Sequence, residues 1–310
     1  MKIAFVFPGQ GSQTVGMMDA WADDASVQAT LQIGNEALGE DLAGLVARGP
    51  AETLNLTTHT QPAMLLCSVA MYRAWGTAGG QTPELVAGHS LGEYSALVAA
   101  QALDLADAVR TVRVRADAMQ SAVPVGQGGM AAIIGLDDDA VRTACAQAEQ
   151  GQAVEAVNFN APGQVVIAGH AEAVARACEL AKAAGAKRAL VLPVSAPFHS
   201  RLLEPAARVL AQALAGVAVS SPAIPLINNV DVAQPRDPAG IRDALVRQAW
   251  HPVRWVETIQ AMKREGVTHI VECGPGKVLS GLIRRIDRDI QSFNITDPAS
   301  LRQTLDALRG

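Results

Sequence analysis

The residues GHSLG, positions 88 to 92, could place a serine nucleophile on a sharp turn. A Gly-x-Ser-x-Gly pentapeptide has this role when a strand precedes the serine and a helix follows it, because the turn then points the hydroxyl out of the sheet. Residues 84–88 (ELVAG) predict a short buried strand, and residues 91–100 (LGEYSALVAA) predict a helix. We therefore interpret Ser90 as a nucleophile. A chance match in a chain rich in glycine and alanine is the alternative.

A serine nucleophile needs a base, and the sequence contains six histidines. His199 lies in SAPFHS, a connection that follows a predicted buried strand and precedes a predicted helix. Loops at strand ends collect active-site groups in such sheets, and an imidazole at a helix N-terminus tends to stay neutral, as a base must. His89 is adjacent to the serine, but the turn points neighbouring side chains in different directions. We expect His199 to be the base; a structural or solvent-facing histidine is the alternative.

Strand-like and helix-like segments alternate along the chain, which favours an α/β fold with a mainly parallel sheet covered by helices. The loop GQGG (126–129) marks a first boundary, and prolines near residue 197 mark a return. Between them the order is strand, helix, two strands, helix, strand, which is typical of a ferredoxin-like domain. The segments in this stretch are 130–135, 137–150, 153–159, 164–169, 171–184 and 187–194. We predict a small domain inserted into a larger one.

Composition excludes several classes of protein. The 310 residues are 49% hydrophobic and 18% charged, which indicates a compact chain and not a disordered one. The net charge is -5, so the chain lacks the excess of basic residues that is typical of a nucleic-acid binder. The apolar run 3–7 is broken by Pro8 and is too short for a signal peptide or a membrane span, so we expect a cytoplasmic protein without membrane contact. The four cysteines are spaced singly, which predicts buried small side chains and neither zinc ligands nor disulfides.

Several segments, in order and spacing, closely resemble the malonyl-CoA:acyl carrier protein transacylases. They are PGQGSQ, GHSLGEYSALVAA, an arginine 25 residues after the serine, NFNAPGQVVIAG, PFHS, QxxxPVRW and GPGKVLSGL. The resemblance covers nearly the whole chain. It implies an α/β-hydrolase-like catalytic domain made of residues 1–125 and 198–310, with a ferredoxin-like insertion at residues 126–197. Both agree with the pattern of segments described above.

The resemblance also implies a reaction. Ser90 would take the malonyl group from coenzyme A as an ester, with His199 as general base and then general acid. The phosphopantetheine thiol of acyl carrier protein would then attack that ester, in a step that feeds fatty acid biosynthesis. The backbone N–H groups of Gln10 and Leu91 would form the oxyanion hole, and a backbone carbonyl near Gln248 would orient His199 in place of a carboxylate. It implies no metal and no cofactor besides the coenzyme A thioester as substrate, and we expect a monomer.

A malonyl group carries a carboxylate, which a bidentate arginine binds better than a lysine does. On the predicted helix 105–122, Arg113 and Arg115 flank an apolar stripe on opposite sides, and periodicity does not choose between them. The resemblance selects Arg115. An arginine paired with the substrate carboxylate in a dry pocket would discriminate malonyl from acetyl groups, because an acetyl group would leave the cation unpaired.

Three further residues belong to the implied substrate site. Phe198 precedes the base, and related acyltransferases with a bulky aromatic residue there favour malonyl over methylmalonyl groups; Pro197 departs from some versions of that signature. Asn160 and Asn158 would lie near the cleft, although a role in the turn before Pro162 is an equal alternative. Gln248 belongs to this site as well as to the orientation of His199.

Other interpretations stay open at this stage. GQGSQT follows the predicted first strand, residues 2–7, and has Thr14 where a dinucleotide-binding loop needs its third glycine. We therefore read it, like GPGK (274–277), as a turn near the site. The carrier protein is expected to be acidic, and Lys187 with Arg188, or Arg284 with its neighbours Arg285 and Arg288, could bind it or could be ordinary solvated charges. The rival functions are a trans-acting polyketide synthase acyltransferase, a serine esterase or thioesterase, and a non-catalytic binding protein.

Overall fold

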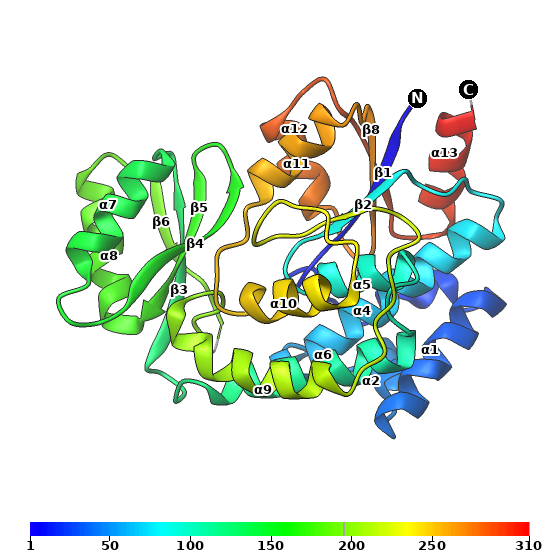
Figure 1. The fold of residues 1–310 in the computed structure, drawn as a ribbon, viewed down its shortest axis with the longest axis horizontal. Helices are drawn as coiled ribbons and strands as arrows, with labels where there is room; N and C mark the ends of the chain where they lie inside the picture. Colours follow the sequence, from blue (N-terminus) through cyan, green and yellow to red (C-terminus); the bar gives the residue numbers. More distant parts are fainter. Residues whose placement is uncertain (195, 310) are drawn as a thin grey trace.

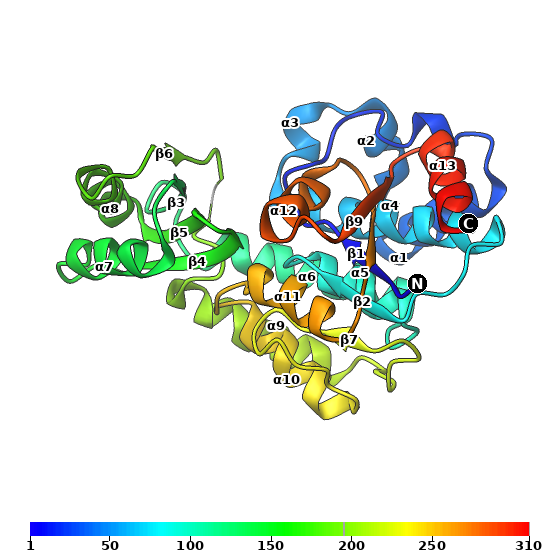
Figure 2. The ribbon, with the colours of Figure 1, turned by 90° about the horizontal axis from the view of Figure 1, so that it is seen from above.

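The computed structural model describes residues 1–194 and 196–309. Two units lie side by side along the long axis of the molecule, a larger one and a smaller one that is coloured green in Figure 1. Figure 2 shows the same separation from above, with the small unit at one end. The larger unit holds a parallel sheet and the smaller unit a separate antiparallel sheet. The predicted α/β class is therefore confirmed.

The large unit is built on a five-stranded sheet in the order β7-β2-β1-β8-β9, and all of its strand pairs are parallel. Its strands are β1 (Ile3–Phe7), β2 (Leu85–Gly88), β7 (Leu226–Ile227), β8 (His269–Cys273) and β9 (Gln291–Ile295). Every residue of β1 and β2 is buried. Such continuous apolar runs are expected where helices cover both faces of a parallel sheet.

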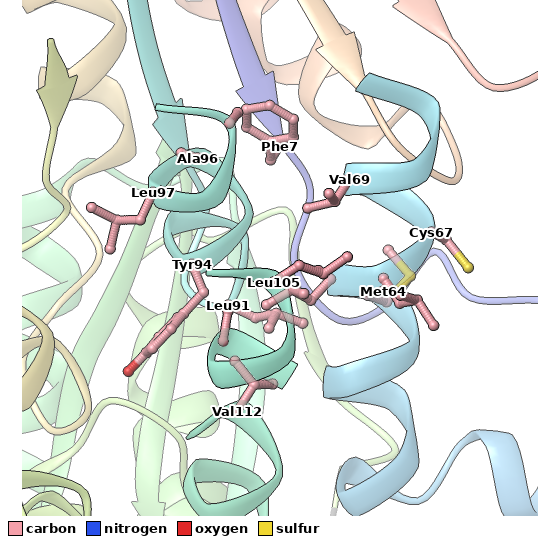
Figure 3. Close-up of a cluster of buried hydrophobic side chains, with 14 of the residues drawn as sticks. Phe7, Met64, Cys67, Val69, Leu91, Tyr94, Ala96, Leu97, Leu105 and Val112 are labelled. Carbon is pink, nitrogen blue, oxygen red and sulfur yellow. The ribbon is translucent and has the colours of Figure 1, made fainter. Parts of the chain in front are cut away.

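The side chains of β1 divide between two cores because successive residues of a strand point to opposite faces. Phe5 and Phe7 enter the larger core, in which side chains from β1, α4, α5 and α6 pack together (Figure 3). Ala4 and Val6 enter a second core with residues of α11 and α12. The central strand is thereby fixed in register from both sides, and its carboxyl end carries the loop with Gln10.

Thirteen α-helices and two short 3-10 helices complete the described residues. Those of the large unit are η1 (Asp19–Trp21), α1 (Ala25–Leu38), α2 (Leu42–Arg48), α3 (Ala51–Leu54), α4 (Thr57–Thr77), α5 (Gly92–Ala99), α6 (Leu105–Ser121), η2 (Arg201–Leu203), α9 (Glu204–Ala215), α10 (Pro238–Gln248), α11 (Trp255–Arg264), α12 (Val278–Ile286) and α13 (Pro298–Arg309). Asp24, Asp104 and Asp237 accept backbone N–H bonds at the starts of α1, α6 and α10 and so stabilise these ends.

The small unit follows the predicted order of strand, helix, two strands, helix, strand. Its elements are β3 (Gly128–Ile134), α7 (Asp138–Ala148), β4 (Val154–Ala161), β5 (Gln164–His170), α8 (Ala171–Ala183) and β6 (Arg188–Val191). The sheet order is β4-β5-β3-β6, with antiparallel pairs throughout. One prediction needs correction: Gly128 and Gly129 are not loop residues, because they pair with His170 and Gly169 and begin β3.

The two faces of the small sheet have different surroundings. Ala131, Ile133 and Ile167 pack under α7 and α8 in a core of their own. Met130, Val157 and Val166 point to the other face and pack with the partly buried Phe198. This second side of the sheet faces the large unit.

Main-chain bonds join the two units. Val253, just before α11, donates its N–H to Val157 at 2.8 Å and accepts the N–H of Phe159 at 3.0 Å, so it pairs with β4. Arg201 bonds Glu149 and Glu155 of the small unit from the segment that follows His199. Hydrogen bonds therefore connect the small unit to the large one at two places.

Two predictions from composition can be compared with the structure. Cys67, Cys145, Cys178 and Cys273 are buried free thiols, as predicted. Of the helices in residues 1–194 and 196–309, none combines the length and the apolar character that crossing a bilayer requires.

Candidate active site

Ser90 occupies a sharp turn between β2 and α5 and has a positive φ of 54°. The turn requires glycine on both sides. A Cβ on Gly88 would lie 1.9 Å from the backbone of Gly92, and one on Gly92 would lie 2.1 Å from the carbonyl oxygen of Phe7. The strand, turn and helix predicted around the serine are thus all present, and the hydroxyl is exposed to the cavity between the units.

His199 and Ser90 meet across this cavity. The Nε2 atom of His199 lies 2.7 Å from Ser90 Oγ, and Nδ1 lies 2.8 Å from the carbonyl oxygen of Gln248. A carbonyl oxygen can only accept a hydrogen bond, so Nδ1 carries the proton and Nε2 presents its lone pair to the serine. No carboxylate contacts this imidazole within the part of the chain that the structure describes, so the pair is a dyad oriented by a backbone carbonyl.

The His199 imidazole is neutral in the folded protein. Burial, followed by the positive charge of Arg115, lowers the pKa of His199 to about 3. A neutral imidazole at pH 7 can accept the serine proton without losing one first. His199 also has a positive φ of 65°, so both residues of the pair adopt backbone conformations that are uncommon outside glycine.

Arg115 points into the same site, and Arg113 does not. The Nη2 atom of Arg115 lies 3.1 Å from Ser90 Oγ and 3.0 Å from Gln248 Oε1, and Nη1 donates to Gln61 Oε1 at 2.6 Å. Arg115 is 2% exposed. Arg113 instead makes a bidentate bond with Glu40 at 2.6 and 2.8 Å. Of the two arginines that helical periodicity left open, Arg115 is therefore the one that lies beside Ser90.

The cavity around these groups has a volume of about 140 Å³ and two kinds of wall. Polar residues of the large unit form one side, namely Gln10, Gln61, His89, Ser90, Arg115 and His199. Apolar residues of the small unit form the other, namely Met130, Val166, Leu192 and Val194. Phe198, Leu91 and Asn158 complete the lining. A polar floor beneath an apolar wall suits a ligand with a charged end and an apolar shaft.

One predicted site residue lies elsewhere. Asn160 does not line the cavity; its Oδ1 accepts a hydrogen bond from His89 Nε2 at 2.8 Å. Asn158 lines the cavity instead, and its buried Oδ1 has no partner among the described residues. The register of β4 shifts on both sides of Phe159, so simple alternation along the strand does not give the direction of either side chain.

Gln248 has a larger role than predicted, although it does not line the cavity. Its side-chain Nε2 donates to the carbonyl oxygen of Ser90 at 2.8 Å, and its Oε1 accepts from Arg115. Its backbone oxygen accepts from His199. One buried residue at the end of α10 therefore contacts the serine, the arginine and the histidine.

Two residues of the site were not predicted from the sequence. Gln61 of α4 orients Arg115, and nothing in its sequence context distinguishes it. Asn229 holds the serine turn from the loop after β7: its Oδ1 accepts the N–H of Ser90 at 2.7 Å and its Nδ2 donates to the carbonyl oxygen of Gly88 at 2.7 Å. The paired asparagines in PLINNV were a possible signal, because amides at the end of a parallel strand face the same edge as the serine.

The glycine-rich segments are turns that pack on each other. A Cβ on Gly274 would lie 2.7 Å from the ring of Pro8, and one on Gly276 would lie 2.7 Å from Cβ of Ser12. The GPGK turn thus packs tightly against the loop that carries Gln10 and supports it. Throughout the described ranges, no three His, Cys, Asp or Glu side chains are grouped so that they could hold a metal ion.

A serine at a strand-to-helix turn, bonded to a buried neutral histidine, is the arrangement of enzymes that pass acyl groups through a serine ester. Comparison with known proteins narrows this class. The family described as the acyl transferase domain matches residues 4–295. The malonyl CoA-acyl carrier protein transacylase of Escherichia coli K12 is 54% identical over 306 residues, which cover 98% of this chain and 99% of that protein.

Solved structures agree with this match. The acyl-carrier-protein S-malonyltransferase from Burkholderia pseudomallei 1710b is 62% identical, with a TM-score of 0.97 over 99% of this chain and 100% of the other. A malonyl-transacylase in complex with a holo type II PKS acyl-carrier protein is 50% identical, with a TM-score of 0.98 over 99% of this chain and 100% of the other. The chain belongs to the acyl transferase family.

Proposed function

We propose that this chain transfers a malonyl group from malonyl-CoA to the phosphopantetheine thiol of acyl carrier protein, through an ester on Ser90. One observation carries the proposal: Ser90 Oγ lies within hydrogen-bond distance of both a neutral histidine and a buried arginine, in a single cavity. A histidine activates the hydroxyl, and an arginine matches an acyl group that ends in a carboxylate. The names of the relatives point to the same substrates.

In the first half-reaction, Ser90 Oγ attacks the thioester carbon while His199 Nε2 takes the hydroxyl proton. The carbonyl oxygen becomes an oxyanion in the tetrahedral intermediate. The carbon–sulfur bond then breaks, and the coenzyme A sulfur leaves with the proton from Nε2. The malonyl group remains as an ester on Ser90, and His199 is neutral again. This order makes one imidazole first the base and then the acid.

The backbone N–H groups of Leu91 and Gln10 are the proposed oxyanion hole. Both residues line the cavity beside Ser90. Leu91 immediately precedes α5, where backbone N–H groups lack partners within the helix. Neither N–H donates to another protein atom among the residues described here. Two preorganised donors of this kind stabilise an oxyanion more than a planar carbonyl.

Arg115 is the proposed ligand of the malonyl carboxylate. It is fully buried, and its hydrogen-bond partners in the described ranges, Gln61, Ser90 and Gln248, include no carboxylate. Its contacts, Gln61 and Gln248, are neutral amides that orient the guanidinium without neutralising it. A malonyl group on Ser90 supplies the missing negative charge, whereas an acetyl group does not. Malonyl is therefore favoured over acetyl.

Phe198 and the small unit set the space for the rest of the acyl chain. Phe198 lines the cavity beside the base and packs on the inner face of the small sheet. We assign it the exclusion of an α-methyl branch, which favours malonyl over methylmalonyl groups. Gln248 belongs to the site through its bonds to Arg115 and His199. Asn160 acts on His89, and Asn158 is the asparagine that reaches the substrate space.

In the second half-reaction, the thiol of the carrier's phosphopantetheine arm enters the cavity and attacks the Ser90 ester with the same residues in reverse roles. The apolar wall formed by Met130, Val166, Leu192 and Val194 suits the aliphatic part of that arm. The exposed arginines Arg284 and Arg285 of α12, and Lys187 with Arg188 at β6, are proposed contacts for the acidic carrier protein.

The finer description of the fold is part of the proposal. Residues 1–125 and 198–310 form an α/β-hydrolase-like catalytic domain, and residues 126–197 form an inserted ferredoxin-like domain. The sheet order β4-β5-β3-β6 with both helices on one face supports this assignment. We further propose a monomeric cytoplasmic enzyme of fatty acid biosynthesis that needs no cofactor besides its thioester substrate.

Transfer assays test the function directly. The protein is incubated with malonyl-CoA in the presence and in the absence of holo acyl carrier protein, and malonyl-carrier and free malonate are quantified. Rapid formation of malonyl-carrier with slow release of malonate supports the proposal. Equally rapid release of malonate without the carrier would indicate an esterase instead.

A further inference from the structure

A buried carboxylate lies behind the active site and has no part in the reaction described above. Glu93, in the first turn of α5, is 1% exposed. Its Oε2 accepts hydrogen bonds from the backbone N–H of Asn229 at 2.9 Å and from Gln248 Nε2 at 3.1 Å. Asn229 bonds Ser90, and Gln248 bonds Arg115. The Glu93 carboxylate is therefore linked to each of these two residues through a single intervening residue.

The carboxylate determines which way the Gln248 amide points. The carbonyl oxygen of Ser90 and the ionised carboxylate of Glu93 both accept from Nε2, and neither of these acceptors allows the amide oxygen in its place. The amide oxygen must then face the opposite side, where it accepts from Arg115 Nη2 at 3.0 Å. A reversed amide would set its NH₂ group against the guanidinium. Glu93, together with the carbonyl oxygen of Ser90, thereby favours the orientation that holds Arg115 beside Ser90.

The same carboxylate supports the serine turn. Asn229 donates its backbone N–H to Glu93 while its side chain bonds both Gly88 and Ser90. The backbone of Ser90 is strained, with φ of 54°, and such a conformation persists only where neighbouring contacts determine it. Glu93 therefore stabilises the residue that fixes the strained turn.

Charge adds to this hydrogen-bonding role. Burial raises the pKa of Glu93 to about 7, whereas the bonds from Asn229 and Gln248 and the positive charge of Arg115 act in the opposite direction. The other ionisable groups that act on it are Asp231, whose negative charge raises the pKa of Glu93, and Tyr94. In its ionised form, Glu93 places a negative charge across one amide from the buried guanidinium of Arg115.

We propose that Glu93 is a positioning residue of the acyl-transfer site: through Gln248 it aims Arg115 at the acyl carboxylate, and through Asn229 it supports the turn at Ser90. The part that concerns Arg115 rests on the function proposed above. The part that concerns the turn does not, because it needs only a reactive serine.

The main test compares Glu93→Met with Glu272→Met. Glu272 of β8 is an equally buried carboxylate that accepts bonds from Leu279 and Ser280 and touches no residue of the cavity. For each variant, kcat/KM is measured for malonyl-CoA and for acetyl-CoA with holo acyl carrier protein. We expect Glu93→Met to lower the malonyl-to-acetyl ratio about tenfold or more, because Arg115 loses its orientation. Glu272→Met keeps the wild-type ratio. An unchanged ratio in folded Glu93→Met, or an equal fall in Glu272→Met, overturns the proposal.

Two further variants separate positioning from folding. Glu93→Gln keeps an acceptor oxygen at the same place and should restore the ratio to within about threefold of wild type. In the double variant Glu93→Met/Gln248→Met, the ratio should fall no lower than in the more affected single variant, because both act through one amide. If the two substitutions instead lower the malonyl-to-acetyl ratio independently, so that their effects multiply in the double variant, the proposal is overturned. Should Glu93→Met not fold, Gln248→Met alone must lower the ratio, and an unchanged ratio overturns it.

Labelling with a fluorophosphonate separates this proposal from the proposed function. The reagent reacts with an activated serine and needs no acyl substrate. Slower labelling of Ser90 in Glu93→Met than in Glu272→Met supports the positioning role even if the wild-type protein transfers no malonyl group. Equal labelling rates of the two folded variants overturn the role at the serine turn.

Discussion

The Nε2 atom of His199 lies 2.7 Å from Ser90 Oγ, although 109 residues separate the two along the chain. Ser90 comes from the turn after β2, and His199 comes from the connection that returns from the small unit. Each has a positive φ, and each is held from outside its own segment, Ser90 by Asn229 and His199 by the carbonyl of Gln248. The geometry of the pair therefore depends on two residues from the last third of the chain, Asn229 and Gln248.

Arg115→Ala should lower malonyl transfer and favour acetyl transfer relative to it. The expected change in the malonyl-to-acetyl ratio of kcat/KM is about 100-fold, because the acyl carboxylate loses a buried bidentate partner. Arg113→Ala is the matched control: it lies on the same helix but bonds Glu40 at the surface. An unchanged ratio in Arg115→Ala would contradict the proposed role.

Asn229→Ala should slow the reaction of Ser90 without changing acyl preference. The variant frees the N–H of Ser90 and the carbonyl of Gly88, and we expect labelling by a fluorophosphonate to slow about 30-fold as the strained turn relaxes. Asn228→Ala is the control, since this buried neighbour bonds only the turn at Asp231 and Ala233. The role of Asn229 is refuted if both variants react at the same rate.

The depressed pKa of His199 predicts a pH-dependent loss of stability. Its pKa is about 3 in the folded protein and near 6.5 when unfolded. Above pH 6.5 both states are neutral; as the pH falls below 6.5, the unfolded state binds a proton that the folded state does not, so stability falls. Between pH 7 and 5, the free energy of unfolding measured with urea should fall by about 2 kcal/mol more for wild type than for His199→Gln. Equal losses would show that His199 is protonated normally in the folded state.

Charge reversal at α12 tests the carrier contact. Replacing Arg284 and Arg285 by Glu should raise KM for acyl carrier protein about fivefold at low salt and leave KM for malonyl-CoA unchanged, because only the carrier meets this surface. The difference should shrink at high salt. Arg302 and Arg309 on α13, changed in the same way, provide the control for net charge. A parallel rise in both KM values would place the effect in the cavity and not at a docking surface.

The sequence predicted the elements around the site well because each had a local signal. The pentapeptide at Ser90, the strand before it and the helix after it are set by neighbouring residues, and the alternating segments from 130 to 194 reveal the small unit. The resemblance, and not periodicity, selected Arg115 over Arg113. The structure agrees because α6 turns only Arg115 toward Ser90.

Other parts carried no local signal. No element was predicted between the first strand and residue 84, and α4 illustrates why: it is buried on nearly all sides, so it lacks the polar face that marks an amphipathic helix. Gln61, Asn229 and Glu93 contribute through bonds to residues far away in the chain. Asn160 was placed near the cleft by resemblance, and it reaches the cavity only through its bond to His89. Such residues become visible only when the strands and loops are placed in space.

The most direct test of the account is to find where the malonyl group resides during the reaction. The protein is incubated with malonyl-CoA without carrier protein, quenched, digested and analysed by mass spectrometry, with His199→Ala as a parallel sample. We predict that the wild-type peptide containing Ser90 gains one malonyl group at that serine, that the group is lost when holo acyl carrier protein is added, and that His199→Ala gains far less. A folded wild-type protein that transfers malonyl without modification at Ser90 would contradict it.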